Sequence, residues 1–495
     1  MDLSSWLERR ADFTPARIAL HFEGADISYA ALHQMMRRQA GALAAQGVGA
    51  GDRVAHLGYN SPELLALIFA CARLGAMALP LNWRLALPEQ RFMLEDATPK
   101  LLLYDAEFAE PAAALAGAGG ARAVPLEEAP AAAERDADPA VSYAAPLLLV
   151  YTSGTTGRPK GAVLSQEALL WNAVNSAHMH DLTSADHVLT TLPMFHVGGL
   201  NIQTLPALHA GARVTLHRRF EVAATLAAIA AARPSLTVLV PAQLTAMMQH
   251  PGWARADLSS LRAITTGSQI VPLALIEALR ARGVPVIQVY GSTETAPIAI
   301  YQIASQALAS AGSCGKPALH CEARIVDGAG RDAAPGERGE ILIRGPNVMR
   351  GYWRDAEATA RALADGWFHT GDIGHQDAEG YFHIDERKND VIISGGENIY
   401  PAEVEAILLA DPRVAEAAVV AKPDARWGEV PVAVVVRRAE VNVGEADLLA
   451  LFAGRLARFK QPRAVVFVTD MPRSALGKVQ RHELRRRLAA GETGA

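Results

Sequence analysis

The sequence lacks several features that mark particular protein classes. Only three of its 495 residues are cysteines, Cys71, Cys314 and Cys321, and their spacing fits no zinc-binding pattern. We therefore expect reduced thiols in the core of a cytoplasmic protein. No uncharged apolar run approaches about 18 residues, and the first residues show no basic and then apolar signal segment. Both absences argue against a membrane-spanning or secreted chain.

A strong excess of charge is also missing. The chain has 47 lysines and arginines against 52 aspartates and glutamates, a formal net charge of −5. This balance argues against nucleic acid as a partner, so any polyanionic ligand has to be bound by local donors. Half of the residues are apolar, as in ordinary globular proteins, and the length predicts two or three domains with a large core.

What the sequence does contain is a repeated alternation of strand-like and helix-like segments. It predicts an α/β fold with a mostly parallel sheet covered by helices, in which ligands lie at the carboxyl ends of strands. The strand-like segments are 53–57, 188–192, 213–216, 236–240, 261–265 and 284–290, and the helical ones include 62–74, 221–232 and 272–282. Residues 108–139 are low in complexity, and we expect surface connections there with at most one weak alanine-rich helix.

The pattern changes twice towards the C-terminus. Short strands at 322–326, 339–344 and 380–384 predict a β-rich subdomain over about 320–388. We expect an N-terminal domain at 1–388 and a small α+β domain at 389–495. In the latter we predict strands at 391–393, 414–421, 430–436 and 464–468 and helices at 401–409 and 445–459.

The stretch that organises the chain is 151–161, Tyr-Thr-Ser-Gly-Thr-Thr-Gly-Arg-Pro-Lys-Gly, which follows the apolar run 146–150. Glycines bring the backbone close to a ligand, successive N–H groups can bind an anion, and the hydroxyls and Lys160 suit phosphate oxygens. It is not a Walker A motif, because Pro159 separates glycine from lysine and Gly161 follows the lysine. Alone, the stretch would also fit a glycine-rich surface loop.

Four further motifs follow in order. Tyr290-Gly291-Ser292-Thr293-Glu294 ends an apolar strand, where a carboxylate can bind magnesium and a hydroxyl can bind a phosphate. Thr370-Gly371-Asp372 offers a carboxylate that can accept hydrogen bonds from ribose hydroxyls. The remaining two are residues 386–405, which begin Glu-Arg-Lys-Asn-Asp, and residues 472–481, which contain Gly477-Lys478 ahead of a basic tail.

Together these motifs closely resemble the signature of the adenylate-forming enzymes, the AMP-binding or ANL superfamily. The resemblance spans almost the whole chain, and it is strongest to bacterial fatty acyl-CoA synthetases and to feruloyl-CoA-synthetase-like ligases. It implies a large N-terminal domain followed by a mobile C-terminal lid. It also implies that a carboxylate attacks ATP to form an acyl-adenylate and pyrophosphate, and that the thiol of coenzyme A then displaces AMP.

The resemblance also assigns roles to residues of this sequence. Catalysis would involve Lys478, Glu294, Thr293 and His196, and Mg²⁺ would be held by Glu294 with Thr152. A preorganised ammonium such as that of Lys478 stabilises the charge that develops around the α-phosphate. The ATP or AMP contacts would be Thr152, Ser153, Gly154, Thr155, Thr156, Gly157, Lys160, Gly267, Ser268, Tyr290, Gly291, Ser292, Thr293, Asp372, Arg387 and Lys478.

Two other sites are implied in the same way. The acyl pocket would comprise His196, Val197, Gly198, Gly199, Asn201, Gly291, Ala296 and Pro297, and the coenzyme A tunnel would comprise Ser394, Gly395, Gly396 and Glu397. Asn389 stands at the hinge, where most relatives have aspartate or lysine. Asparagine adopts unusual backbone dihedrals readily, but it has no charge to anchor either domain state. Gln269 departs from the family pattern beside the pocket.

The expected function is therefore an ATP-dependent acid–CoA ligase that uses ATP, Mg²⁺ and coenzyme A and has no prosthetic group. His196 stands where amino-acid-activating relatives place an aspartate, which argues against an amino-acid substrate. Medium- or long-chain fatty acids and aryl or hydroxycinnamic acids both fit the small, apolar pocket residues. Two alternatives stay open: a ligase that loads a carrier-protein phosphopantetheine, and a non-catalytic nucleotide sensor. The commonest closed assembly would be a homodimer.

Overall fold

The structure is a computed structural model in two compact units. The first comprises Met1–Trp83, Met93–Tyr151 and Gly161–Asp385, and the second comprises Arg84–Phe92, Thr152–Lys160 and Glu386–Ala495. The described residues are all except 127–132, 153–157, 269–270, 272, 306, 308–309, 311, 388–390, 439–440, 442, 473–478 and 492–495, and the side chains of 274, 386, 387 and 402 are also left out.

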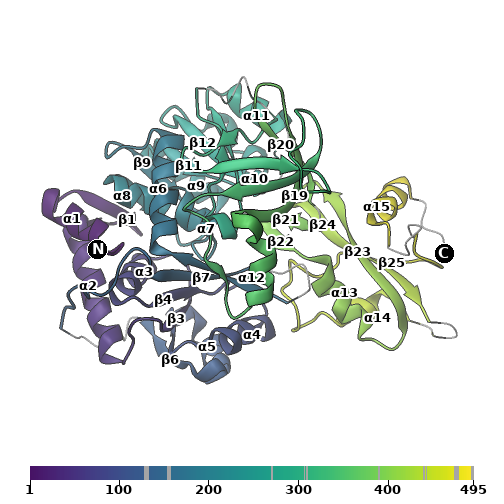
Figure 1. The fold of residues 1–495 in the computed structure, drawn as a ribbon, viewed down its shortest axis with the longest axis horizontal. Helices are drawn as coiled ribbons and strands as arrows, with labels where there is room; N and C mark the ends of the chain where they lie inside the picture. The colour runs from purple at the N-terminus through teal and green to yellow at the C-terminus, as the bar shows by residue number, and fades with distance from the viewer. Residues whose placement is uncertain are drawn as a thin grey trace. The chain divides into compact units, whose positions relative to one another are not determined.

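The largest sheet of the first unit has nine strands (Figure 1). Its order is β15-β14-β13-β12-β11-β9-β10-β1-β2, and the strands from β13 to β1 pair in parallel. The bounds are β1 Ile18–Phe22, β2 Ala25–Ser28, β9 His187–Thr190, β10 Arg213–Leu216, β11 Leu236–Val238, β12 Ala263–Gly267, β13 Val286–Tyr290, β14 Ile300–Tyr301 and β15 Lys316–Pro317. The accompanying helices are α6 Gln166–His180, α7 Val197–Gly199, α8 Leu205–Ala210, α9 Val222–Ala232, α10 Pro241–Gln249 and α11 Leu273–Arg280.

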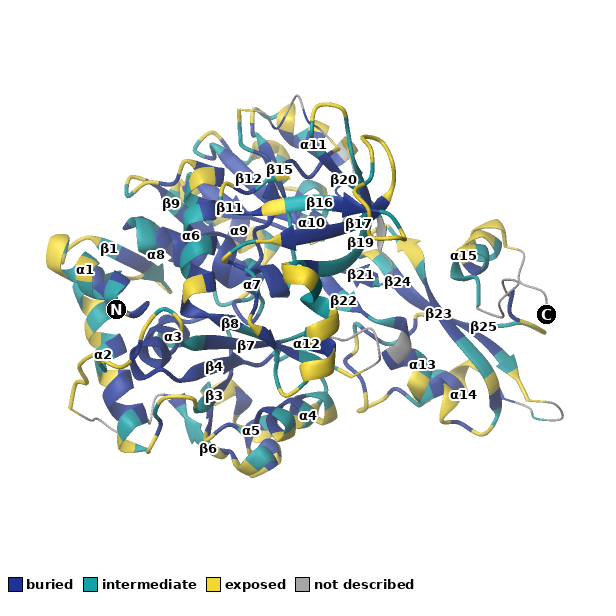
Figure 2. Cartoon of the chain, in the orientation of Figure 1, coloured by how far each residue is buried: buried dark blue, intermediate teal, exposed yellow. Residues whose placement is uncertain are grey.

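A second sheet has seven strands in the order β18-β8-β7-β4-β3-β5-β6. Its strands are β3 Arg53–Leu57, β4 Met77–Pro80, β5 Leu101–Tyr104, β6 Arg122–Pro125, β7 Pro146–Thr152, β8 Lys160–Ser165 and β18 Gly351–Tyr352. The first helices are α1 Ser5–Phe13, α2 Tyr29–Ala45, α3 Pro62–Leu74, α4 Leu87–Ala97 and α5 Ala109–Leu115. Figure 2 shows β4 buried throughout and β7 buried over its middle residues, as expected for central strands of a sheet.

Helix α3 shows how directly some signals act. The Ser61 hydroxyl accepts the N–H of Leu64, Pro62 takes the first helical position, and Gly75 ends the helix with φ +67°. Residues 64–74 of the helix are all buried. Burial of its apolar side chains therefore stabilises the helix in addition to the signals at its two ends. The bounds of the helix are those predicted from the sequence, 62–74.

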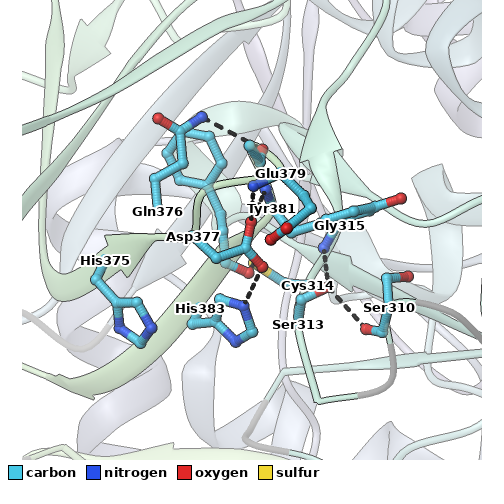
Figure 3. A network of polar contacts seen from close by, with 12 residues as sticks. Ser310, Ser313, Cys314, Gly315, His375, Gln376, Asp377, Glu379, Tyr381 and His383 are labelled. Carbon is cyan, nitrogen blue, oxygen red and sulfur yellow. Dashed lines mark hydrogen bonds and ion pairs between the residues drawn. The ribbon is translucent and has the colours of Figure 1, made fainter. Parts of the chain in front are cut away.

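A four-stranded antiparallel sheet, β16-β17-β19-β20, forms the predicted β-rich part. Its strands are Glu322–Val326, Gly339–Arg344, Phe368–Gln376 and Phe382–Arg387, with α12 at Ala356–Ala362. Figure 3 shows the β19–β20 hairpin, in which Asp377 Oδ1 accepts the N–H of Tyr381 and Asp377 Oδ2 pairs with His383 at 3.0 Å. The rings of His375 and His383 stack 4.8 Å apart. These contacts fix the strand that leads into residues 386–390.

The second unit carries a five-stranded sheet, β22-β21-β24-β23 with β25 beside β24. Its elements are β21 Ile392–Ser394, β22 Glu397–Ile399, α13 Pro401–Leu409, β23 Val414–Asp424, β24 Gly428–Arg437, α14 Glu445–Ala450, β25 Val465–Phe467 and α15 Arg481–Ala490. Lys460, 4% exposed, lies 2.6 Å from Glu403 and 2.9 Å from Glu89. A buried ammonium is tolerable here because two carboxylates surround it.

The α/β fold class is confirmed, with two local corrections. The helix predicted over 445–459 ends at Ala450, and Gly454 beyond it has φ +69°, a conformation that an α-helix cannot contain. Residues 108–139 include a real strand, β6, which pairs in parallel with β5 although its sequence is short and only partly apolar. The three cysteines are free and buried, and none of the described helices is long and apolar enough to cross a membrane.

Stability is expected to fall in mild acid. Burial lowers the pKa of His180, His187 and His209 to about 4. Below about pH 6.5 the unfolded chain binds a proton at such a histidine, whereas the folded protein does not until the pH approaches 4. The free energy of unfolding therefore has its full value above about pH 6.5 and decreases as the pH falls towards 4. We expect a loss of about 1–2 kcal/mol for each of His180 and His209 between pH 7 and pH 5, and a smaller loss for the partly exposed His187, measured by urea unfolding.

The control is His209→Phe, which keeps an aromatic ring against Trp6, whose ring lies 4.6 Å from that of His209. In this variant the free energy of unfolding should decrease less between pH 7 and pH 5, by the amount that His209 contributes. Identical pH profiles for the variant and the unmodified protein would contradict the assignment.

Candidate active site

The predicted phosphate loop is bracketed by two strands of the seven-stranded sheet. Strand β7 ends at Thr152 and β8 begins at Lys160. The hydroxyl of Thr152 donates to the carbonyl oxygen of Lys160 at 3.4 Å, which ties the two ends of the loop. Ser153, Gly154, Thr155, Thr156 and Gly157 lie outside the described residues, so their phosphate contacts stay predictions.

Two of the predicted motifs meet in the first unit. The hydroxyl of Tyr290, at the end of β13, donates to Asp372 Oδ2 at 2.8 Å, although 82 residues separate them. The Asp372 N–H donates to Thr370 Oγ1, whose hydroxyl donates to the carbonyl oxygen of Ile341. The Thr-Gly-Asp carboxylate is thus held in place from both its backbone and its side chain. Such a carboxylate can accept the two hydroxyls of a ribose.

Glu294 lies in the short 3₁₀ turn Thr293–Thr295 directly after β13. Its side chain is 8% exposed, and Oε1 accepts the hydroxyl of Tyr352 at 2.9 Å. Sequence reasoning missed Tyr352, and no local signal marks it, because 58 residues separate it from Glu294. The N–H of Met349 also donates to the Glu294 carbonyl oxygen, so the segment around β18 fixes both the backbone and the carboxylate of Glu294.

The residues fit a magnesium ion in chemistry. Glu294 supplies a carboxylate oxygen, and Mg²⁺ in nucleotide sites is bound by one or two carboxylates together with phosphates and water. No group of three or more histidine, cysteine, aspartate or glutamate side chains that could hold a metal ion occurs among the described residues. The second predicted ligand, Thr152, belongs to the other unit.

Three glycines of the predicted sites serve close packing of the backbone. A Cβ at Gly267 would lie 2.5 Å from the carbonyl oxygen of Val289, one at Gly291 would lie 1.7 Å from that of Pro297, and one at Gly199 would lie 2.3 Å from that of Pro193. Only Gly198 among the pocket glycines has open space where a Cβ would be. Ser268 is exposed and has φ +70°, and the Ala296–Pro297 peptide bond is cis.

The predicted acyl segment begins with aromatic side chains. The ring of His196 lies 4.6 Å from that of Phe195, and Phe195 makes an edge contact with Trp83. Trp83 in turn contacts Tyr59 and Phe108, a cluster that the sequence did not reveal. Val197 is buried at the start of α7. The chain then enters the π-helical turn η4 (Leu200–Thr204). Asn201 in this turn is 1% exposed, and neither of its side-chain amide atoms has a partner among the residues that the structure describes.

The predicted tunnel residues form a tight hairpin between β21 and β22. Ser394 pairs with Glu397, and Gly395 and Gly396 have φ +60° and +86°, the pattern of a two-residue turn that requires positive φ at both positions. The Gly395 N–H donates to the carbonyl oxygen of Trp427, and Glu397 pairs with Arg84 at 2.6 Å within the second unit. The two glycines are thus explained by the turn, whatever passes beside it. Arg387 has only its backbone described, and Gln269, Asn389 and Lys478 lie outside the described residues.

The sequence was also compared with protein families and with known proteins. The profile of the AMP-binding enzyme family matches residues 7–353, and that of the AMP-binding enzyme C-terminal domain matches residues 403–478. An indoleacetate–CoA ligase from Aromatoleum aromaticum is 53% identical, with 99% of this chain and 98% of the relative covered. A feruloyl-CoA synthase from an Amycolatopsis species is 44% identical, with 98% and 99% covered.

Among solved structures, the o-succinylbenzoate CoA synthetase of Bacillus subtilis superposes with a TM-score of 0.89. It is 36% identical, with 97% of this chain and 98% of that one covered. The matches extend over the nucleotide motifs, the β-rich part and the C-terminal domain alike. The resemblance read from the sequence is thereby confirmed, and this chain belongs to the AMP-binding enzyme family.

Proposed function

We propose that this enzyme activates an aryl-substituted carboxylic acid. The chain is an AMP-forming acid–CoA ligase, which joins a carboxylic acid to coenzyme A through an acyl-adenylate and releases AMP and pyrophosphate. The observation that carries the aryl assignment is the 53% identity, over nearly the full length of both chains, to a ligase named for indoleacetate. The aromatic rings of Phe195 and Trp83 beside His196 also favour an aryl acid over a fatty acid as the substrate, because aromatic side chains pack well against a ring.

Each motif would supply residues for a different part of the reaction. Asp372, steadied by Tyr290, would hold the ribose, and Glu294 would carry the magnesium ion, which supplies Lewis-acid stabilisation of the phosphates when bound. Lys160 and the loop 153–157 would bind phosphate oxygens, and Lys478 would stabilise the charge that develops as the carboxylate attacks the α-phosphorus. After pyrophosphate leaves, the acyl-adenylate carbonyl accepts the coenzyme A thiolate, and AMP departs.

The test is pyrophosphate and AMP release with ATP, Mg²⁺, coenzyme A and a panel of acids. The panel contains indole-3-acetate, ferulate, 4-coumarate, benzoate and straight-chain acids from acetate to palmitate. We expect at least one aryl acid to exceed every aliphatic acid in kcat/KM. A kcat/KM that rises with aliphatic chain length would refute the aryl assignment. Turnover with free coenzyme A also excludes a carrier protein as the required acceptor.

Tyr290→Phe should weaken ATP binding more than catalysis. The substitution removes the hydroxyl that donates to Asp372 Oδ2 at 2.8 Å and leaves the ring in place. Since one hydrogen bond to a charged group is worth about 1.5–3 kcal/mol, we expect the KM for ATP to rise about tenfold or more. The KM for the acid should change little. An unchanged KM for ATP would contradict a ribose-binding role for Asp372.

A further inference from the structure

A run of buried hydrogen bonds connects α6, η4 and β12 in the first unit. His180 Nδ1 lies 2.8 Å from the carbonyl oxygen of Ser176, and because a carbonyl oxygen only accepts, Nδ1 carries the ring proton. The other ring nitrogen, Nε2, is therefore an acceptor. It lies 3.1 Å from Nε2 of Gln203 and 2.8 Å from Oγ1 of Thr265.

This direction fixes the orientation of the Gln203 amide. Its Nε2 donates towards His180 and also reaches Thr265 Oγ1 at 3.2 Å, so Oε1 is the atom left over. Among the described residues Oε1 has no hydrogen-bond partner, although Gln203 is only 1% exposed. Burial also keeps the His180 ring neutral, since its pKa falls to about 4, so protonation does not reverse the amide near neutral pH.

An unpaired buried acceptor requires an explanation. Buried polar atoms are nearly always hydrogen-bonded, and leaving one unpaired costs about as much as losing a hydrogen bond. Every other polar group in this run is used: Ser176 Oγ donates to the carbonyl oxygen of Ile202, and Thr265 Oγ1 contacts both His180 and Gln203. The missing donor is therefore expected from outside the chain.

The position of Gln203 indicates that the donor belongs to the acid substrate. Thr265 is the middle residue of β12, two positions before Gly267, which stands at the carboxyl end of the strand, the edge where parallel sheets bind ligands. Gln203 lies in the π-helical turn that directly continues the predicted acyl segment, and such turns are frequent at functional sites. Within the described part of the chain, the buried amide of Asn201 in the same turn and the buried hydroxyl of Thr266 in β12 are also unpartnered.

We propose that Oε1 of Gln203 accepts a hydrogen bond from the substrate ring, so that the enzyme selects aryl acids whose ring carries an N–H or O–H group. The inference rests on the proposed function and narrows its substrate class. His180 and Thr265 are positioning residues, because they hold the amide without reaching the ring. An indole N–H and a phenolic O–H share the required chemistry.

The first test compares matched acids on the unmodified enzyme by pyrophosphate release. Indole-3-acetate is paired with benzothiophene-3-acetate, in which sulfur replaces the N–H, and 4-coumarate is paired with cinnamate. A buried acceptor left without its donor should lower kcat/KM about tenfold or more in at least one pair, and the pair that responds tells N–H from O–H. Equal kcat/KM within both pairs would overturn the inference while leaving the aryl assignment intact. Absence of activity with all four acids would refute both.

The second test uses Gln203→Met, which keeps the side-chain length and removes the acceptor. The ratio of kcat/KM within the discriminating pair should collapse towards one. The matched control is Gln302→Leu, because Gln302 is equally buried but both of its amide atoms are bonded, Oε1 to the Gln288 N–H and Nε2 to Ser310. That control should retain the ratio, whatever its effect on stability. A ratio that survives in Gln203→Met would overturn the inference, and if the variant fails to fold, the acid pairs decide alone.

Discussion

Lys478→Ala is expected to reduce adenylation about 10²–10³-fold, the usual cost of removing one preorganised donor from a developing oxyanion. The same variant should convert a supplied aryl-adenylate to the CoA thioester at a rate within a few-fold of the unmodified enzyme. The reason is that the ammonium is needed while charge builds on the α-phosphate, and thioester formation releases AMP without that step. Pyrophosphate release and thioester absorbance measure the two half-reactions separately.

A suitable control is Arg486→Ala on α15, an exposed cation of the same basic tail that pairs with Glu483. Its loss changes the net charge as Lys478→Ala does, and both half-reactions should be preserved. Equal damage to adenylation and thioester formation by Lys478→Ala would contradict the assigned role.

Glu294→Gln is expected to lower kcat/KM for ATP about 10²-fold or more, since Lewis-acid stabilisation by a bound metal is worth several kcal/mol. The amide oxygen can still accept the Tyr352 hydroxyl, which lies 2.9 Å from Glu294 Oε1, so the local fold should persist. What is lost is the negative charge that holds the ion. The variant should therefore need a higher Mg²⁺ concentration for half-maximal rate.

Two comparisons make this result specific. Glu357→Gln removes an exposed carboxylate that pairs with Arg361 on the same helix, and it should leave the Mg²⁺ dependence unchanged. Tyr352→Phe keeps the charge of Glu294 but frees its carboxylate, so it should have an intermediate effect. An unaltered Mg²⁺ requirement in Glu294→Gln would exclude this side chain as the metal ligand.

Local signals were enough for much of the fold. Helix α3 spans the predicted residues 62–74, and strands β3, β10, β16 and β17 have the predicted bounds. These features depend on caps and on runs of apolar residues within a few positions of one another, which the sequence displays directly. The extent of α14 was wrong, because the end of a helix with no strong stop signal at its last turn depends on what packs around it.

For the candidate site too, some features could be predicted from the sequence and others required the structure. The sequence by itself determined the family and the order of its motifs, because each motif is contiguous, and it named the carboxylates and lysines for which we propose catalytic and binding roles. Only the tertiary structure decided that Tyr290 steadies Asp372, that Tyr352 fixes Glu294 and that His180 orients Gln203. These pairs lie 82, 58 and 23 residues apart, and no local pattern specifies a hydrogen bond between side chains that meet only when strands and helices pack.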